Sequence, residues 1–299
     1  MKKPAALILI LAIVVVSGVI LFGRLTDREP EKRPARDSTL TRLETFIEES
    51  PNEISLVYYD FADESMEGIN ESKKIFPASM IKSLFLLAAL EKVKEGELSL
   101  DETYTLKEED KYMNDKPVTG SGTMQNEEPG KEFRVEEILH LMVSISDNIA
   151  ANVTVDLVGR DSITNLLDRM GLNNTSAQQK MFEPPNGVPR NMSTAIDLTK
   201  MLIALENATV VNEKLSQEGI SMMKDTTDKN RIGRNLEDGI TLANKIGTAS
   251  SMIGDMGLLY FPNRPPIALT IMVENPDDPD QAEEEIGQLT SIIVDSLGQ

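Results

Sequence analysis

The six residues PASMIK, positions 77–82, place a serine and a lysine three residues apart at the start of a stretch with helical periodicity. Side chains at this spacing lie on one face of a helix, within reach of a hydrogen bond. A serine hydroxyl becomes a good nucleophile when a base takes its proton, and a neutral, desolvated lysine can be that base. The pattern alone is not specific, because the chain repeats it at Ser221 and Lys224. We interpret that second copy as an ordinary polar pair on a helix.

Two further motifs follow the first one. Residues 146–148 read SDN inside an apolar helical segment, and residues 245–248 read KIGT inside a predicted strand. Three motifs of these types, in this order, resemble those of the penicillin-recognising serine hydrolases and class A β-lactamases. The resemblance covers residues 39–299, and it implies a serine hydrolase that forms an acyl-enzyme.

The resemblance also implies a role for each matching residue. Ser79 is expected to be the acylated nucleophile, and Lys82 its base or proton relay. Ser146 is expected to pass a proton to the leaving nitrogen, while Asn148 holds the amide side chain of the substrate. We interpret Asp147 as a structural residue.

The third motif supplies the expected substrate contacts, which are Lys245, Gly247 and Thr248. Lys245 is expected to attract the substrate carboxylate and, through its charge, to lower the proton affinity of Lys82. The backbone N–H groups of Ser79 and Thr248 are expected to form the oxyanion hole.

Two positions depart from the family pattern. Ile246 stands where the third motif usually has a hydroxyl residue. Glu183, in the stretch FEPPNG at 182–187, is the expected base for deacylation, but Gly187 replaces the asparagine that usually helps it. Three functions therefore stay open: a β-lactamase, a D-Ala-D-Ala-type carboxypeptidase or transpeptidase, and a low-turnover module that binds β-lactams or peptides.

The hydropathy pattern predicts an interwoven α+β domain. Helices are predicted at 39–49, 79–94, 193–205 and 281–297, and strands at 54–61, 242–248, 256–261 and 267–273. An early strand must therefore join late strands across a mainly helical insert. This agrees with the resemblance, which implies an antiparallel sheet flanked by helices and a helical subdomain at about 76–205, with the active site between them.

The composition excludes several classes of function. The chain has 299 residues and a net charge of −19, which argues against binding nucleic acid. It has no cysteine, so disulfides, iron–sulfur clusters and a thiol nucleophile are excluded. The single histidine, His140, lies on an apolar helix where its spacing predicts packing. We expect no metal and no cofactor, and a monomer.

The first residues predict a link to a membrane. Residues 5–22 are almost uninterruptedly apolar, long enough for a helix that crosses a bilayer. We interpret residues 1–23 as a signal anchor, or alternatively a cleaved signal peptide, and residues 24–38 as a charged linker. The basic residues of that linker favour a cytoplasmic side. We nevertheless expect an extracytoplasmic protein, because its expected small-molecule partners, β-lactams and cell-wall peptides, are met outside the cytoplasm.

Overall fold

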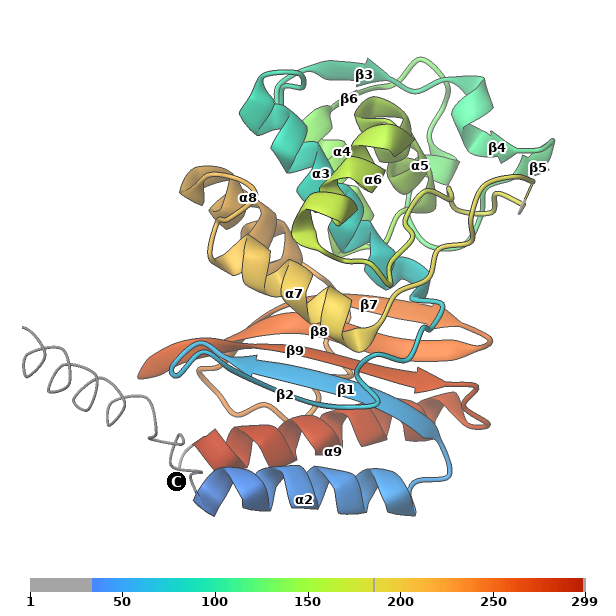
Figure 1. The fold of residues 1–299 in the computed structure, drawn as a ribbon. Coiled ribbons are helices and arrows are strands. Elements are labelled where there is room, and N and C mark those ends of the chain that lie inside the picture. The colour runs from blue at the N-terminus through green and yellow to red at the C-terminus, as the bar shows by residue number, and fades with distance from the viewer. Residues whose placement is uncertain (1–33, 185, 298–299) are drawn as a thin grey trace, which may run out of the picture.

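A five-stranded antiparallel sheet forms the centre of the protein, as a computed structural model shows for residues 34–184 and 186–297 (Figure 1). The strands lie in the order β2-β1-β9-β8-β7. Their bounds are β1 Glu53–Asp60, β2 Ser65–Ile69, β7 Thr241–Ala249, β8 Met252–Phe261 and β9 Arg264–Glu274. β1 pairs with β9, with Leu56 opposite Ile271. The predicted joining of an early strand to three late strands is therefore confirmed.

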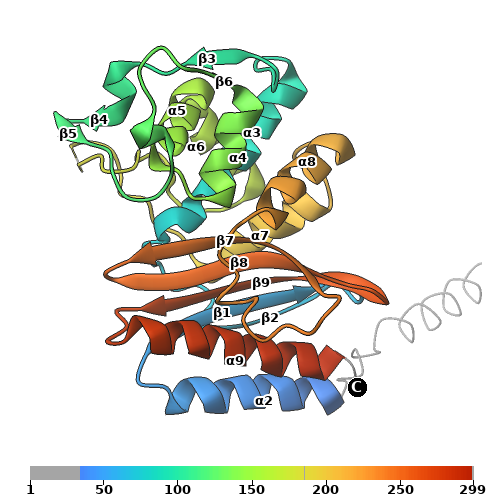
Figure 2. The same ribbon diagram turned by 180° about the vertical axis from the view of Figure 1, so that it is seen from behind.

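Two helices from the chain ends cover one face of the sheet (Figure 2). They are α2, Pro34–Glu49, and α9, Pro279–Leu297. Leu43 of α2 and Ile286 of α9 pack with the sheet residues Ile54 and Ile271 in one fully buried apolar cluster. Because α2 begins at Pro34, residues 34–38 of the predicted linker are helical.

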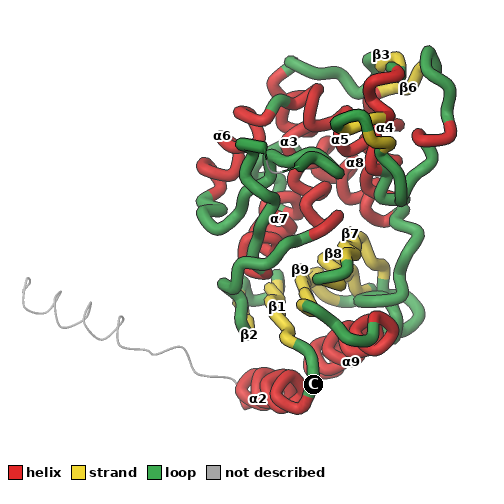
Figure 3. The backbone as a smooth tube through the Cα atoms, turned by 90° about the vertical axis from the view of Figure 1, so that its right-hand side faces the viewer, coloured by secondary structure: helices red, strands yellow, loops and turns green. Residues whose placement is uncertain are grey.

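The other face of the sheet carries the helical body (Figure 3). Its helices are α3 Lys82–Glu95, α4 Val135–Ser144, α5 Asn148–Val158, α6 Arg160–Met170, α7 Ala195–Glu206 and α8 Glu213–Lys224, with a short 3-10 turn, η1 Ala78–Ile81, before α3. α7 packs on β9 and β1, while α8 contacts α3, α4 and β7. The helical body thus continues beyond the predicted limit at 205, to Lys224.

Helix α3 is the centre of this body, since every residue from Lys82 to Leu90 is buried. Its amphipathic pattern is weak because neighbours surround it on all sides. The outer rim of the body consists of two small strand pairs and two 3-10 turns: β3 Thr103–Thr105 with β6 Glu132–Arg134, β4 Tyr112–Met113 with β5 Lys116–Pro117, η2 Glu108–Lys111 and η3 Met124–Asn126. The arrangement is the α+β fold that the sequence predicts.

Among residues 34–184 and 186–297, no helix is both long and apolar enough to cross a membrane. The predicted segments 1–23 and 5–22, and the linker up to residue 33, lie outside the described residues.

Candidate active site

Ser79 lies in η1, at the start of the buried helix α3 and beside strand β7. The close approach of β7 requires a glycine at position 247. A Cβ there would lie 2.6 Å from the backbone oxygen of Pro77 and 3.0 Å from Cγ of Met80. Ala78, directly before Ser79, has a positive φ of 45°, an unfavourable conformation for a residue with a side chain. The surrounding contacts therefore fix the backbone that carries Ser79.

Lys82 is completely buried and reaches the second motif. Its Nζ lies within hydrogen-bond distance of the backbone oxygen of Ser146 (2.6 Å), of Ser146 Oγ (3.2 Å) and of Asn148 Oδ1 (2.8 Å). The expected hydrogen bond from Lys82 to Ser79 is not formed, and within the described part of the chain the Ser79 hydroxyl has no hydrogen-bond partner. Catalytic hydrogen bonds often form only once substrate is bound.

The surroundings of Lys82 lower its pKa. Burial lowers its pKa well below the usual value, and the nearby charge of Lys245 lowers it further, while Asp147 acts in the opposite direction. A buried ammonium group loses its hydration, so the neutral amine is favoured. The expected effect of Lys245 on the proton affinity of Lys82 therefore agrees with the structure.

Asp147 holds the second motif in place without facing the reaction centre. Its Oδ1 accepts hydrogen bonds from the N–H groups of Ile149 and Ala150, which caps α5, and its Oδ2 accepts from Thr123 and Met124. These four bonds satisfy backbone donors in two segments. Asp147 thus has the structural position that the sequence analysis gave it.

Lys245 is fully buried on β7, where its Nζ donates to the backbone oxygen of Ile246 at 3.2 Å. Burial is the main cause that lowers the pKa of Lys245 to about 7, and Arg231 acts in the same direction, while Asp255 opposes it. The charge that is expected to attract a substrate carboxylate is therefore partial at neutral pH. Ile246, next to it, is half-buried and has no polar side-chain atom.

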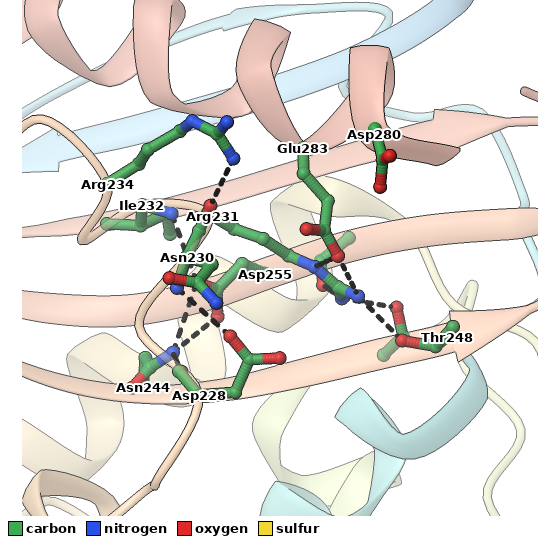
Figure 4. Close-up of polar contacts among 12 residues, drawn as sticks. Asp228, Asn230, Arg231, Ile232, Arg234, Asn244, Thr248, Asp255, Asp280 and Glu283 are labelled. Carbon is green, nitrogen blue, oxygen red and sulfur yellow. Dashed lines mark hydrogen bonds and ion pairs between the residues drawn. The ribbon is translucent and has the colours of Figure 1, made fainter. Parts of the chain in front are cut away.

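Arg231 is a residue of this region that the sequence reasoning missed (Figure 4). Its guanidinium is buried beneath the sheet, where Nη1 donates to the backbone oxygens of Gly247 and Gly254, both at 2.8 Å. Nη2 donates to Thr248 Oγ1 at 2.7 Å and to Glu283 of α9 at 3.0 Å. Arg231 thereby links the third motif to the C-terminal helix. It belongs to no motif, so only the tertiary contacts identify it.

Asp255 is a second buried charge close to the third motif. It lies opposite Ile246 on β8 and accepts hydrogen bonds from Asn244 Nδ2 and from the N–H of Ile232. Burial raises the pKa of Asp255 to about 6, although these hydrogen bonds and Arg231 act against the rise. Lys245 and its neighbour Asp255 therefore both have pKa values close to neutral pH.

Glu183, the expected base for deacylation, is not brought into contact with the other site residues. Both of its carboxylate oxygens accept hydrogen bonds from Arg160 Nη2, at 2.8 and 2.9 Å, and one also accepts from the N–H of Lys180. Its proposed role stays a prediction. The structure thus joins Lys82, Ser146 and Asn148 directly and leaves Glu183 paired with the first residue of α6.

His140, for which the spacing on its helix predicts packing, is half-buried on α4. Its Nε2 lies 3.1 Å from Asp225 Oδ2, and 43% of its side chain is accessible. Ser144, the neighbouring serine, is buried and donates its hydroxyl to the backbone oxygen of His140. The three side chains are close together, but the serine is not presented to a substrate. Within the described residues, no group of three or more acidic, histidine or cysteine side chains is arranged to hold a metal ion.

Known proteins resemble this chain over most of its length. The sequence profile described as the β-lactamase enzyme family matches residues 38–297. The β-lactamase VEB-1 of Pseudomonas aeruginosa is 23% identical over 265 residues, which cover 84% of this chain and 87% of that protein. A β-lactamase of Streptomyces lavendulae is 24% identical over 294 residues, covering 95% and 93% of the two chains.

Solved structures share the fold. A β-lactamase from Sphaerobacter thermophilus superimposes with a TM-score of 0.79 at 23% identity, covering 87% of this chain and 97% of its own. A variant of PBP-A, solved as an acyl-enzyme complex with penicillin G, gives a TM-score of 0.79 at 22% identity, covering 90% and 99%. Both are similar over nearly their whole length.

Proposed function

The chain belongs to the β-lactamase enzyme family, and from this premise we propose that it hydrolyses β-lactams through an acyl-enzyme on Ser79. One observation carries the proposal. Lys82 is fully buried, its pKa is lowered far below the usual value by that burial, and its amine contacts the hydroxyl of Ser146. A neutral lysine beside the nucleophile can accept the proton that an ammonium group cannot.

In the proposed acylation step, Oγ of Ser79 forms a bond to the carbonyl carbon of the β-lactam, and the Ser79 proton passes to Lys82. As the ring C–N bond breaks, Ser146 gives its proton to the leaving nitrogen. Ser146 then regains a proton from Lys82, whose Nζ lies 3.2 Å from its Oγ. The new N–H thus balances the proton that Ser79 lost, and Lys82 returns to its neutral form.

Groups on both sides of Ser79 would bind the substrate. Asn148 already accepts from Lys82 through Oδ1 and donates to the backbone oxygen of Thr119 through Nδ2. Its amide is therefore held in one orientation, with one N–H and one lone pair left for an amide side chain of the substrate. Thr248 and Lys245 would receive the carboxylate, since Ile246 offers no hydroxyl. The backbone N–H groups of Ser79 and Thr248 would bind the developing oxyanion.

The same proposal extends to the place of the protein in the cell. We expect a monomer outside the cytoplasm, anchored through residues 5–22, or secreted if that segment is cleaved. Protease added to intact cells should then digest the protein while a cytoplasmic marker survives. Protection until lysis would contradict this placement, and a solution mass of twice 33.0 kDa would contradict the monomer.

Intact-protein mass spectrometry with a penicillin and a cephalosporin tests the function. The parent protein should gain the mass of the antibiotic and lose it again as antibiotic is consumed. Ser79→Ala should gain none. Ser221→Ala, which removes the serine of the second Ser-x-x-Lys pattern, is the matched control and should behave like the parent.

The other outcomes are equally clear. An adduct that requires Ser79 but never decays would indicate a cell-wall peptidase or a β-lactam-binding protein instead of a hydrolase of these drugs. No adduct on the folded parent protein would refute the proposed function.

A further inference from the structure

The carboxylate of Glu183 is held by a single arginine at the start of α6. Arg160 Nη2 donates to both carboxylate oxygens, at 2.8 and 2.9 Å, and the side chain of Glu183 is only 16% accessible. The N–H of Lys180 donates a further bond of 2.9 Å to one of the oxygens. Within the described residues, every hydrogen bond of the Arg160 guanidinium goes to Glu183, and its Nη1 is buried without a partner. Within this part of the chain, the Arg160 guanidinium therefore binds Glu183 and no other acceptor.

The loop before Glu183 is tied to α5 at a different residue. Asn152 accepts from the N–H of Met181 at 2.6 Å and donates to the backbone oxygen of Met181 at 3.2 Å. Asn152 lies one helical turn after Asn148, the residue that accepts from Lys82, so the two asparagines share one face of α5. The loop thus presents the backbone of Met181 along this face, and Glu183 turns towards α6.

We propose that Arg160 is a positioning residue that withholds Glu183 from the acyl-enzyme and makes deacylation the slow step of turnover. This inference rests on the proposed function. In deacylation, the oxygen of a water molecule bonds to the ester carbonyl carbon, and the bond from that carbon to Ser79 Oγ breaks. A base must take one proton from the water and return it to Ser79. A carboxylate that accepts two hydrogen bonds from Arg160 of α6 and a third from the N–H of Lys180 is neither placed nor free to do so.

The decisive experiment measures how fast the penicillin adduct decays after free antibiotic is removed. The parent protein and Glu183→Gln should lose the adduct at rates within twofold of each other, because the carboxylate is not in use. Arg160→Gln should lose it at least tenfold faster, because Glu183 is released. The double variant should return to the slow rate of the parent, a reversal that a merely structural role of Arg160 would not produce.

A matched control lies on the same helix. Arg169 forms a more exposed ion pair, with Glu91, and Arg169→Gln should leave the decay rate unchanged. Arg160→Lys keeps the charge with a single ammonium group and should give an intermediate rate. If Arg160→Gln does not fold, as the lack of a cooperative unfolding transition would show, Arg160→Lys still tests the proposal.

Hydrogen exchange supplies a readout that needs no antibiotic. The amides of residues 180–183 should exchange faster in Arg160→Gln and in Glu183→Gln, and the double variant should add no further increase. If Glu183→Gln slows adduct decay tenfold in the parent background, or if both Arg160 variants decay at the parent rate, the inference is refuted and the proposed function stands. If no variant forms an adduct, the proposed function fails, and the inference fails with it.

Discussion

Replacing Arg231 with methionine should destabilise the protein, because this guanidinium is buried and makes five hydrogen bonds. The substitution removes five hydrogen bonds, to the backbone oxygens of Gly247 and Gly254, to Thr248 Oγ1, and two to Glu283. Methionine fills much of the volume but can donate to none of these groups.

The magnitude follows from what is left behind. Each buried acceptor without a partner costs about 1–3 kcal/mol, and breaking a buried ion pair costs about 3–5 kcal/mol. Because Glu283 is about a quarter exposed, water can solvate its carboxylate once Arg231 is removed, and the free-energy cost of breaking this ion pair is smaller. We therefore expect Arg231→Met to lose about 3–5 kcal/mol of unfolding free energy, a fall of roughly 10 °C in Tm for a domain of this size.

Urea and thermal unfolding measure this loss, with Arg234→Met as the control. Arg234 is a neighbour of Arg231 whose Nη1 makes one exposed contact of 3.4 Å to the backbone oxygen of Asn230 (Figure 4), so its loss should change stability by less than 1 kcal/mol. Glu283→Gln keeps an acceptor for Arg231 and should cost about 1–2 kcal/mol. If Arg231→Met loses less than 1 kcal/mol, the argument from buried polar contacts is wrong.

Four further predictions concern the motifs. Asp147→Ala leaves four backbone N–H groups without their acceptor and should cost about 3 kcal/mol in urea unfolding; a loss below 1 kcal/mol would contradict its capping role. Gly247→Ala places a Cβ 2.6 Å from the Pro77 oxygen and should slow acylation of Ser79 about a hundredfold or more, as adduct formation would show; an unchanged rate would mean that β7 and η1 can separate freely. The charged fraction of Lys245, whose pKa is about 7, falls about tenfold per unit above that pH, so the second-order acylation rate should fall there, and a flat profile from pH 7 to 9 would exclude a role for its charge. Since the unfolded chain keeps the Lys245 proton up to about pH 10.4, this group should make stability rise with pH between about 7 and 10, a rise that Lys245→Met should remove.

Local patterns predicted four of the five strands of the central sheet, because the information for a strand lies within a few residues. The short apolar run at 267–273 and the apolar face of 281–297 sufficed for β9 and α9. The helices α6 and α8 were not predicted as whole elements, although both carry an apolar repeat. The sequence analysis placed only Ser221 and Lys224, at the end of α8, on a helix. Glu183 was predicted to be the base for deacylation from its distance along the chain after the second motif. That role remains a prediction, and in the structure the carboxylate of Glu183 pairs with Arg160.

The sequence by itself determined the three motifs, their order and the elements that carry them, and these were enough to identify the family. The tertiary structure decided the burial that lowers the pKa of Lys82, the ion pair of Glu183 with Arg160 and the position of Arg231 under the third motif. The physical reason is the separation along the chain of the residues that interact. Periodicity and motif spacing depend on neighbours along the chain, whereas desolvation and ion pairing depend on which distant segments meet. Arg231 and Glu283 are 52 residues apart, and no local pattern pairs them.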